Sequence, residues 1–226
     1  MADLSLKQAV ATDIELDEAV DYTPEAAYAN VTLKRTIKTG YNTVVLPFNL
    51  DEAQTAEVFG DGAQVYTYRE EADGEQSTIY FDKKDEAVIV ANQPVLVKAT
   101  ADATEKTIEG VVVSDASVQN VTGTNFDFVG SYSGLSLEDG DYFFNGDKLY
   151  RSNGVGNAMK GFRAYLQSKT ANAEARLVIG DMETGIEAVN SGDVVADKAI
   201  YTLSGQRVSK AQRGLYIVSG KVIVVK

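Results

Sequence analysis

From Asn30 onward the chain is a succession of short segments in which apolar and polar residues alternate, separated by turn residues. Successive side chains of a β-strand point to opposite faces, so a period of two indicates strands that bury one face. About ten such segments recur at a spacing of roughly 8–12 residues, without the alternation of strand and helix typical of a parallel sheet. The sequence therefore predicts an all-β fold: an antiparallel β-sandwich of jelly-roll or immunoglobulin-like type, or an open barrel, with one short helix.

Two dipeptides predict hairpins within this pattern, Asp73-Gly74 and Asn145-Gly146. Asn145-Gly146 is the stronger signal, because a type I′ turn needs positive φ at both of its central residues. The alternating segments Phe162–Leu166 and Ala175–Ile179 are predicted to pair with each other and close the sheet.

The predicted helix follows Pro47. Asn49 is placed at the N-cap, Glu52 at the capping-box position and Gly60 at the C-terminal end. Residues 1–27 are rich in alanine and acidic residues and have weak periodicity, so they are expected to form a linker or a short helix. The apolar side of that helix would carry Leu4, Ala9 and Ile14.

The absence of two residue types restricts the possible chemistry. The chain has no His and no Cys, which excludes Ser-His-Asp and Cys-His catalysis, His-zinc sites, iron–sulfur clusters and disulfides. An enzyme of this composition would depend on carboxylates such as Glu70/Glu71 or Asp82/Asp85, in the manner of a glycosidase. With 33 acidic residues such pairs arise by chance, so we expect a non-catalytic protein without a cofactor.

Charge and hydropathy restrict the partners. The formal net charge of −12 disfavours binding to nucleic acid, because most of the surface would repel phosphates. No apolar stretch approaches the roughly 20 residues of a transmembrane helix. The N-terminus has neither a basic segment nor a long apolar run, so it does not read as a signal peptide.

Two groups of side chains are candidates for ligand binding. Tyr66 and Tyr68 share one face of a predicted strand and could line a sugar or protein surface. Core packing and cross-strand pairing are the favoured explanation for them. Asp139, Asp141 and Asp147 offer oxygen ligands for Ca²⁺, but their spacing does not fit an EF-hand. A hairpin through these residues would separate their side chains, so no metal site is expected.

The C-terminal residues differ in charge from the rest of the chain. Residues 198–226 contain six basic residues and no acidic one, whereas the preceding part has an excess of acidic residues. The polar, glycine-containing segment 185–193 reads as a linker. We therefore divide the chain into an N-terminal segment (1–27), a β-sandwich body (28–182) and a C-terminal β region (183–226).

The C-terminal region contains an ordered series of short motifs. An aliphatic-aromatic strand, a turn and a basic strand precede a Gly-Leu-Tyr-Ile-Val strand and a final basic hairpin. The defining residues are Tyr201, Leu203, Gly205, Arg207, Val208, Gly214, Tyr216, Ile217, Gly220 and Lys221. This pattern resembles an abbreviated form of the sorting and anchoring region of Bacteroidetes proteins exported by type IX secretion, of the gut Bacteroidales kind. Between the two halves only residues 209–213 remain, a shorter connection than in the full-length sorting domain.

The body is similar, more loosely, to a region that often precedes such tails. The matching phrases are Tyr41–Phe48, Ala91–Lys98, Phe128–Tyr132 and Met159–Tyr165. This second resemblance implies location and architecture, and no activity.

The two resemblances imply an exported or cell-surface protein whose signal peptide has been removed or lies upstream, with the secretion machinery and cell-surface components as partners. The simpler interpretation of the tail is a pair of hairpins that complete a sheet. The alternative function is that of a carbohydrate-binding accessory module in a secreted polysaccharide-degrading protein, with a glycan as partner.

Overall fold

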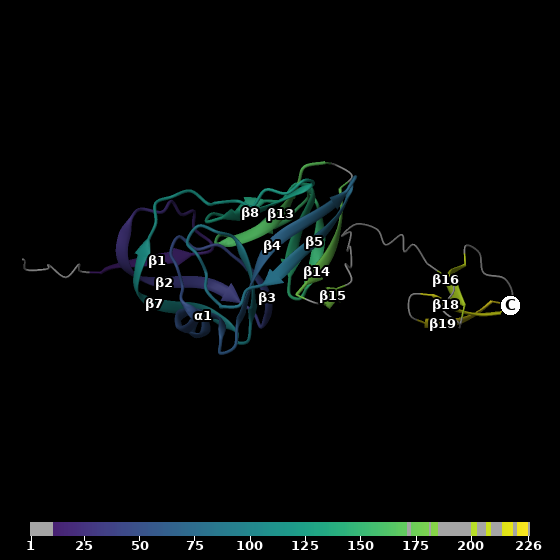
Figure 1. Ribbon diagram of the computed structural model, residues 1–226, viewed down its shortest axis with the longest axis horizontal. Helices are drawn as coiled ribbons and strands as arrows, with labels where there is room; N and C mark the ends of the chain where they lie inside the picture. Colours follow the sequence, from purple (N-terminus) through teal and green to yellow (C-terminus); the bar gives the residue numbers. More distant parts are fainter. Residues whose placement is uncertain are drawn as a thin grey trace, which may run out of the picture. The chain divides into compact units, whose positions relative to one another are not determined.

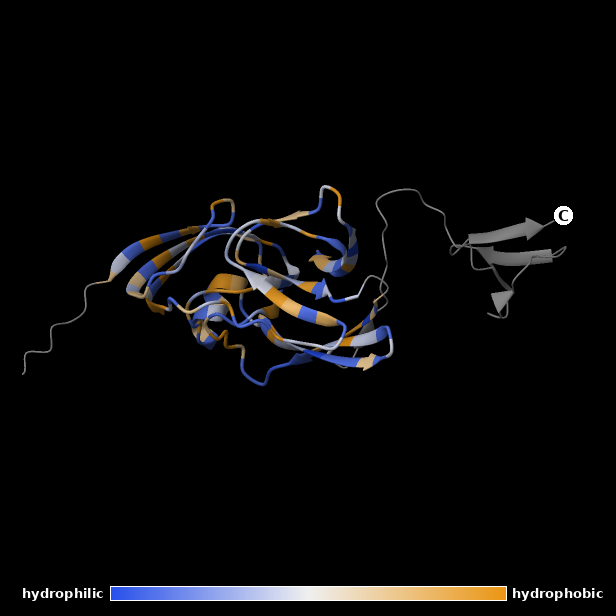
Figure 2. Ribbon diagram, turned by 90° about the horizontal axis from the view of Figure 1, so that it is seen from above, coloured by the Kyte–Doolittle hydropathy of each residue, from blue (hydrophilic) through white to orange (hydrophobic). Residues whose placement is uncertain are grey.

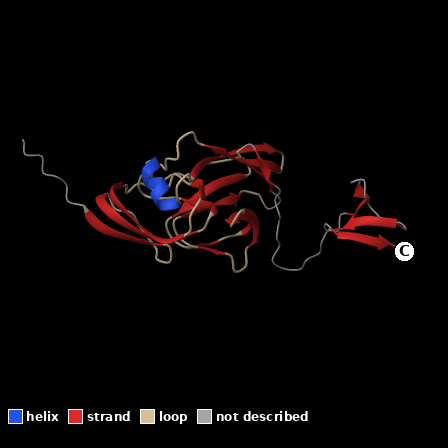
Figure 3. Cartoon of the chain, turned by 90° about the horizontal axis from the view of Figure 1, so that it is seen from below, coloured by secondary structure: helices blue, strands red, loops and turns tan. Residues whose placement is uncertain are grey.

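The computed structural model describes residues 11–170, 173–180, 182–184 and four strands between residues 200 and 225. Strands dominate this part of the chain, with a single helix among them (Figure 3). The all-β fold class predicted from the alternating segments is confirmed. The chain forms two compact units, Met1–Asn190 and Ser191–Lys226.

A three-stranded sheet of order β1-β2-β7 forms one part of the first unit (Figure 1). Its strands are β1 (Thr12–Asp17), β2 (Ala27–Ile37) and β7 (Ala103–Val113). Bands of apolar and polar residues alternate along them (Figure 2), as expected for strands with one buried face.

Strand β1 corrects the prediction of a linker or short helix over residues 1–27. It runs parallel to β2, with Ile14 opposite Val31 and Leu16 opposite Leu33. Leu16 is fully buried and Ile14 packs beside it, so this acidic segment hides a short period-two pattern. Leu4 and Ala9 lie outside the described residues.

The larger part of the unit has two facing sheets, with orders β15-β14-β5-β4-β6-β3 and β11-β10-β13-β8. Side chains from both meet in one core, which includes Phe81, Phe128 and Leu166. This arrangement is sandwich-like, and most of its strand pairs are antiparallel. The strands of the first sheet are β3 (Gly40–Val44), β4 (Gln64–Asp73), β5 (Gln76–Lys83), β6 (Val95–Ala99), β14 (Glu174–Ile179) and β15 (Met182–Thr184). Those of the second are β8 (Phe126–Ser131), β10 (Asp139–Asn145), β11 (Lys148–Asn153) and β13 (Arg163–Ser168).

Two short strands, β9 (Leu135–Ser136) and β12 (Ala158–Met159), form a separate pair. Strand β15 turns back along β14, so residues 183 and 184 belong to the body sheet and not to the predicted C-terminal region. Gly180, with φ +59°, lies in the turn between them, a conformation that side chains rarely adopt.

The predicted pairing of Phe162–Leu166 with Ala175–Ile179 is wrong. Strand β13 pairs with β10 and β8, whereas β14 runs parallel to β5. The two strands contribute apolar side chains to the same core from different sheets, including Leu166 and Ile179. The alternation of apolar residues in both segments therefore reflects burial in that core, and not hydrogen bonding between the two strands.

The helix α1 (Glu52–Phe59) begins two residues later than predicted. Asp51 is the N-cap and accepts from Gln54 N at 2.8 Å, and the Gln54 side chain accepts from Asp51 N at 3.2 Å. Asn49 instead accepts a hydrogen bond from Ala91 N at 2.7 Å. Gly60 ends the helix as predicted, with φ +97°.

Both predicted hairpins are present, but their turn residues lie one position further along. Asp73 pairs with Gln76, and Asn145 pairs with Lys148. The central positions are therefore Gly74-Glu75 and Gly146-Asp147, and only the glycines have positive φ. The type I′ assignment, which requires positive φ at both centres, is wrong for Asn145-Gly146.

The second unit contains one described sheet, of order β17-β16-β18-β19 and antiparallel throughout. Its strands are β16 (Ile200–Thr202), β17 (Arg207–Val208), β18 (Gly214–Val218) and β19 (Lys221–Val225). They overlap the four segments in which the sequence predicts strands, Ala199–Leu203, Gln206–Val208, Leu215–Val218 and Val222–Val225. Strands β18 and β19 each begin one residue earlier than predicted. Leu203, Gly205 and Gly220 of the sorting-like pattern lie outside the described residues.

Candidate functional site

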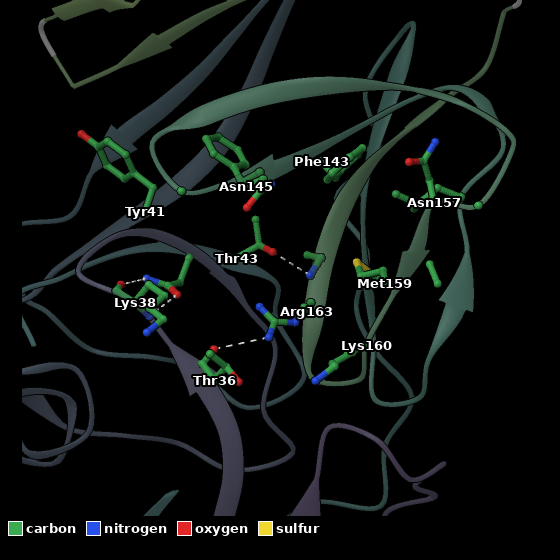
Figure 4. Close-up of a pocket in the computed structure, with 17 residues that line it drawn as sticks. Thr36, Lys38, Tyr41, Thr43, Phe143, Asn145, Asn157, Met159, Lys160 and Arg163 are labelled. Atoms are coloured by element: carbon green, nitrogen blue, oxygen red, sulfur yellow. Dashed lines mark hydrogen bonds between the residues drawn. The ribbon is translucent and has the colours of Figure 1, made fainter. Parts of the chain in front are cut away.

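A cavity of about 440 Å³ opens beside the end of β2, the start of β3 and the β10–β11 hairpin (Figure 4). Its volume falls within the roughly 300–1,000 Å³ of small-molecule sites. The described lining residues are Thr36, Lys38, Tyr41, Asn42, Thr43, Leu137, Phe143, Phe144, Asn145, Gly146, Gly156, Asn157, Ala158, Met159, Lys160, Arg163 and Ala164.

One part of the lining is apolar and aromatic. Phe143 is half-buried and stacks on Tyr150, with ring centroids 5.8 Å apart. It packs with buried Leu137 and Met159 in a small cluster of its own. Tyr41 lines the cavity as well and contacts Phe144 at 6.5 Å between ring centroids. Three aromatic side chains thus contribute to the lining, one from β3 and two from β10.

The polar lining divides into groups that hold the fold and groups that are available to a ligand. Asn42 is fully used, because it donates to Lys38 O and Gly40 O and accepts from Lys38 N. Asn157 donates to Ser152 and Asn153 and retains its carbonyl oxygen as an acceptor. Asn145 is exposed at the hairpin.

Tyr41 presents a protonated phenol at neutral pH. Burial, together with the neighbouring Tyr66 and Asp147, raises the pKa of Tyr41 to about 12. Its backbone N–H donates to Asp147 Oδ1 at 3.0 Å, which ties the start of β3 to the β10–β11 hairpin. Gly40, with φ +103°, makes room for this carboxylate, since a Cβ there would lie 2.2 Å from Asp147 Oδ1.

Three cationic side chains line the cavity: Lys38, Lys160 and Arg163. Lys38 is exposed and pairs with Asp102 at 2.9 Å. Lys160 and Arg163 share the carboxylate of Glu18, which is 5% exposed; the Lys160 pair measures 2.8 Å. Burial alone would raise the pKa of Glu18, but the hydrogen bond from Lys160 and the charge of Arg163 hold it below its usual value.

A buried guanidinium lies behind this group. Arg35 is 1% exposed and donates to the carbonyl oxygens of Phe162 and Thr43. Burial, reinforced by the charge of Arg163, lowers its pKa well below the usual range. Phe162 has φ +58°, an uncommon conformation for a bulky residue, and its ring is buried against Tyr22 and Tyr132. The segment that carries Lys160 and Arg163 is therefore fixed from both sides.

The tyrosines singled out from the sequence lie elsewhere. Tyr66 and Tyr68 do share one face, but that face is the core of the sandwich, where they are 5% and 7% exposed. The Tyr68 hydroxyl donates to Phe126 O at 2.8 Å, so Tyr68 does not form a sugar-binding surface. Tyr66 reaches a second, more polar cavity of about 660 Å³, which Tyr41 and Lys98 also line.

The three aspartates considered for Ca²⁺ do not converge. Asp139 is exposed at the start of β10, and Asp147 occupies the hairpin turn at the other end of that strand. Asp141 is buried and accepts from Glu138 N and Ser168 N. Among the residues that the structure describes, no group of three or more acidic side chains is arranged to hold a metal ion.

The carboxylates considered for catalysis lie in two places. Asp82 and Asp85 both line the second cavity, of about 660 Å³, whereas Glu70 and Glu71 line neither cavity. Glu70 is held by the backbone N–H groups of Thr124 and Asn125, at 2.6 and 3.0 Å, and by the hydroxyl of Ser77. Glu71 and Asp82 both pair with Arg69 on the surface. No acidic residue is present among the described residues that line the 440 Å³ cavity.

No protein-family model matches the chain, and neither a curated protein nor a solved structure does. The eight-residue helix α1 is the sole helix of the described residues and is far too short to cross a bilayer.

Sequence reasoning missed the cavity residues, although it had singled out two phrases that supply them. Tyr41–Phe48 and Met159–Tyr165 both resemble a recurring region that precedes such sorting tails. In the structure they meet: Ala164 N donates to the Thr43 hydroxyl at 3.1 Å, and both segments line the cavity. The available signal was the occurrence of Lys160 and Arg163 within one of these phrases.

Proposed function

We propose that the chain is a non-catalytic module of an exported or cell-surface protein, with its last forty or so residues as a sorting and anchoring region. The observation that carries the proposal is the tail itself. Its described strands form one antiparallel sheet and share no pairing with the described strands of the body. This is the behaviour expected of an appended signal, in contrast to hairpins that complete the main sheet.

The chemistry of the body supports a non-catalytic role. A carboxylate-based hydrolase needs two acidic groups facing each other across a cleft, at a separation of about 5–10 Å. The described lining of the 440 Å³ cavity has no acidic residue. Asp82 and Asp85 line the 660 Å³ cavity, where the Asp82 carboxylate is already paired with Arg69 at 2.8 Å.

Export is tested with a fluorescent reporter fused to residues 185–226 and expressed in a host with type IX secretion. We expect the reporter at the cell surface or in the medium. The matched control is the same fusion without residues 214–226, which removes β18 and β19. Equal retention of both fusions in the cell would refute the proposal.

A second candidate function is carbohydrate binding by the body. The cavity favours it, because Tyr41 and Phe143 offer aromatic surface while Asn145 and Asn157 offer amide groups for sugar hydroxyls. Titration calorimetry of the whole chain with oligosaccharides tests this role. Tyr41→Ala should weaken binding about tenfold or more. A variant with unchanged affinity would locate the sugar elsewhere.

A further inference from the structure

The cavity beside β10 has a charge opposite to that of the protein. Acidic residues outnumber basic ones by 33 to 21 in the chain, yet the described lining holds three cations and no acid. The carboxylates that contact these lining residues, Glu18, Asp102 and Asp147, are already occupied by side-chain or backbone donors.

The charges around Glu18 do not balance. Lys160 and Arg163 share one carboxylate, and the buried guanidinium of Arg35 lies near enough to influence both Glu18 and Arg163 through its charge. Three cations and one anion leave an excess of positive charge. Lys160 is 59% exposed at its side chain and can turn toward a ligand while Arg163 keeps Glu18 paired.

The cationic segment is also held in place before any ligand binds. Arg35 ties Phe162 O to Thr43 O, and the strained backbone of Phe162 is locked by its buried ring. A preformed site binds more tightly, because little conformational freedom is lost on binding. Such fixation is expected of a binding surface and is unusual for exposed lysines on a solvated loop.

We infer that this cavity takes an anionic saccharide, one whose sugar ring carries a carboxylate or a sulfate group. Lys38 and Lys160 would receive the anionic group, with Arg163 behind them, and Tyr41 and Phe143 would contact the ring. The inference rests on the proposed carbohydrate-binding role and adds the charge of the ligand to it.

The test is titration calorimetry of the full chain with three probes of equal length. These are a trimer of galacturonic acid, a sulfated galactose trimer and the neutral galactose trimer. We expect the acidic trimer, the sulfated trimer or both to bind at least about tenfold more tightly than the neutral one, since hydrogen bonds to charged groups are the stronger ones. The preference should fall as salt is raised from about 0.05 to 0.5 M.

The variants Lys38→Gln and Lys160→Gln should each lower affinity for the anionic probe about threefold to tenfold, and leave the neutral probe unaffected. Lys106→Gln is the matched control, because it removes the same charge from β7, outside the cavity lining. Equal losses in Lys106→Gln would reduce the effect to net charge and overturn the inference.

The outcomes separate the two proposals. Binding of all three trimers with equal affinity would refute the anionic preference and leave carbohydrate binding standing. Binding of none would refute both, without bearing on export, which depends on the reporter fusion.

Discussion

Two carboxylates of the first unit, Glu18 and Glu70, are held by opposite means. Glu18 is nearly buried and is received by cationic side chains, Lys160 and Arg163, at the margin of a cavity. Glu70 is half-buried and is received by backbone N–H groups of residues 124 and 125 and by the Ser77 hydroxyl. Its contacts include no cation among those described.

The difference separates a binding environment from a structural one. Backbone donors carry no net charge, so the Glu70 site has no excess positive charge that could attract a further anion. Its hydrogen bonds hold the loop before β8 in place. The cations around Glu18 exceed the charge that they neutralise, which leaves attraction for a further anion at the adjacent cavity. A carboxylate bound by cationic side chains therefore marks the more promising site in this chain.

The largest effect is expected where the Glu70 site is most crowded. A Cβ on Gly123 would lie 2.0 Å from Glu70 Oε2 and 2.2 Å from Phe126 O. Gly123→Ala should lower the free energy of unfolding by about 3 kcal/mol in urea denaturation, because backbone has to move. The control is Gly134→Ala, whose Cβ would meet its nearest neighbour at 3.5 Å. Equal stability of the two variants would mean that the Glu70 loop adapts freely.

Removal of each carboxylate charge comes next. Glu18→Gln leaves the buried Arg35 and the part-buried Arg163 without their counter-charge and should cost about 2 kcal/mol of unfolding free energy. Glu70→Gln replaces one acceptor oxygen with an NH2 group, which cannot accept from a backbone N–H, so one donor loses its partner. Because these donors are uncharged and partly exposed, the variant should cost about 1 kcal/mol. High salt should shrink the loss in Glu18→Gln and leave that in Glu70→Gln unchanged. The same salt dependence in both variants would show that the surrounding cations contribute no more to the stability of Glu18 than neutral donors contribute to that of Glu70.

The Glu18 contribution should also depend on pH. Because its pKa is lowered in the folded state, ionised Glu18 stabilises the fold, and this stabilisation is fully present above the ordinary carboxyl pKa of about 4.5. It is lost as the pH falls through the lowered value. The stability difference between the wild type and Glu18→Gln should therefore be constant from about pH 5.5 to 7.5 and vanish in acid. A difference that persists at pH 2 would show that packing, and not charge, is responsible.

The smallest change is expected for Lys160→Gln. Its side chain is largely exposed and Arg163 continues to pair with Glu18, so the unfolding free energy should change by no more than about 0.5 kcal/mol. A small stability change combined with a large loss of anion binding would make Lys160 a clean probe of the cavity. A loss near that of Glu18→Gln would assign it to the scaffold instead.

Local patterns predicted the elements of this fold well. From Asn30 onward the alternation of apolar residues predicted the all-β class, and the single helix of the described residues ends at Gly60 as expected. Strand β1 was not predicted, because its period-two pattern is short and lies in an acidic segment. Non-local pairing was not accessible in the same way. The parallel partners β1–β2 and β5–β14 depend on how separate layers close around shared cores, which no short window of sequence records.

The cavity was hidden for a related reason. The residues that line it come from three segments, 36–43, 137–146 and 156–164. No local sequence pattern in any of these segments predicts that it lies next to the other two. Tyr66 and Tyr68 were candidates for ligand binding because aromatic residues on strands occur both in cores and on binding surfaces. In the structure both side chains are buried in the core. The role of Lys160 and Arg163 depends on their contact with Glu18, which lies more than a hundred residues earlier in the sequence.

The contact between Asp147 and the backbone of Tyr41 sets a limit on re-engineering. The β10–β11 hairpin tip is fastened to the first residues of β3, and Gly40 leaves no room for a larger side chain at the junction. Insertions that lengthen this tip would move one wall of the cavity and, at the same time, weaken the contact that holds β3 at the edge of its sheet. Asn145 is exposed at the tip and lines the cavity, whereas the contact with β3 is made by Asp147. Substitutions at Asn145 could therefore change ligand specificity without altering the backbone of the hairpin.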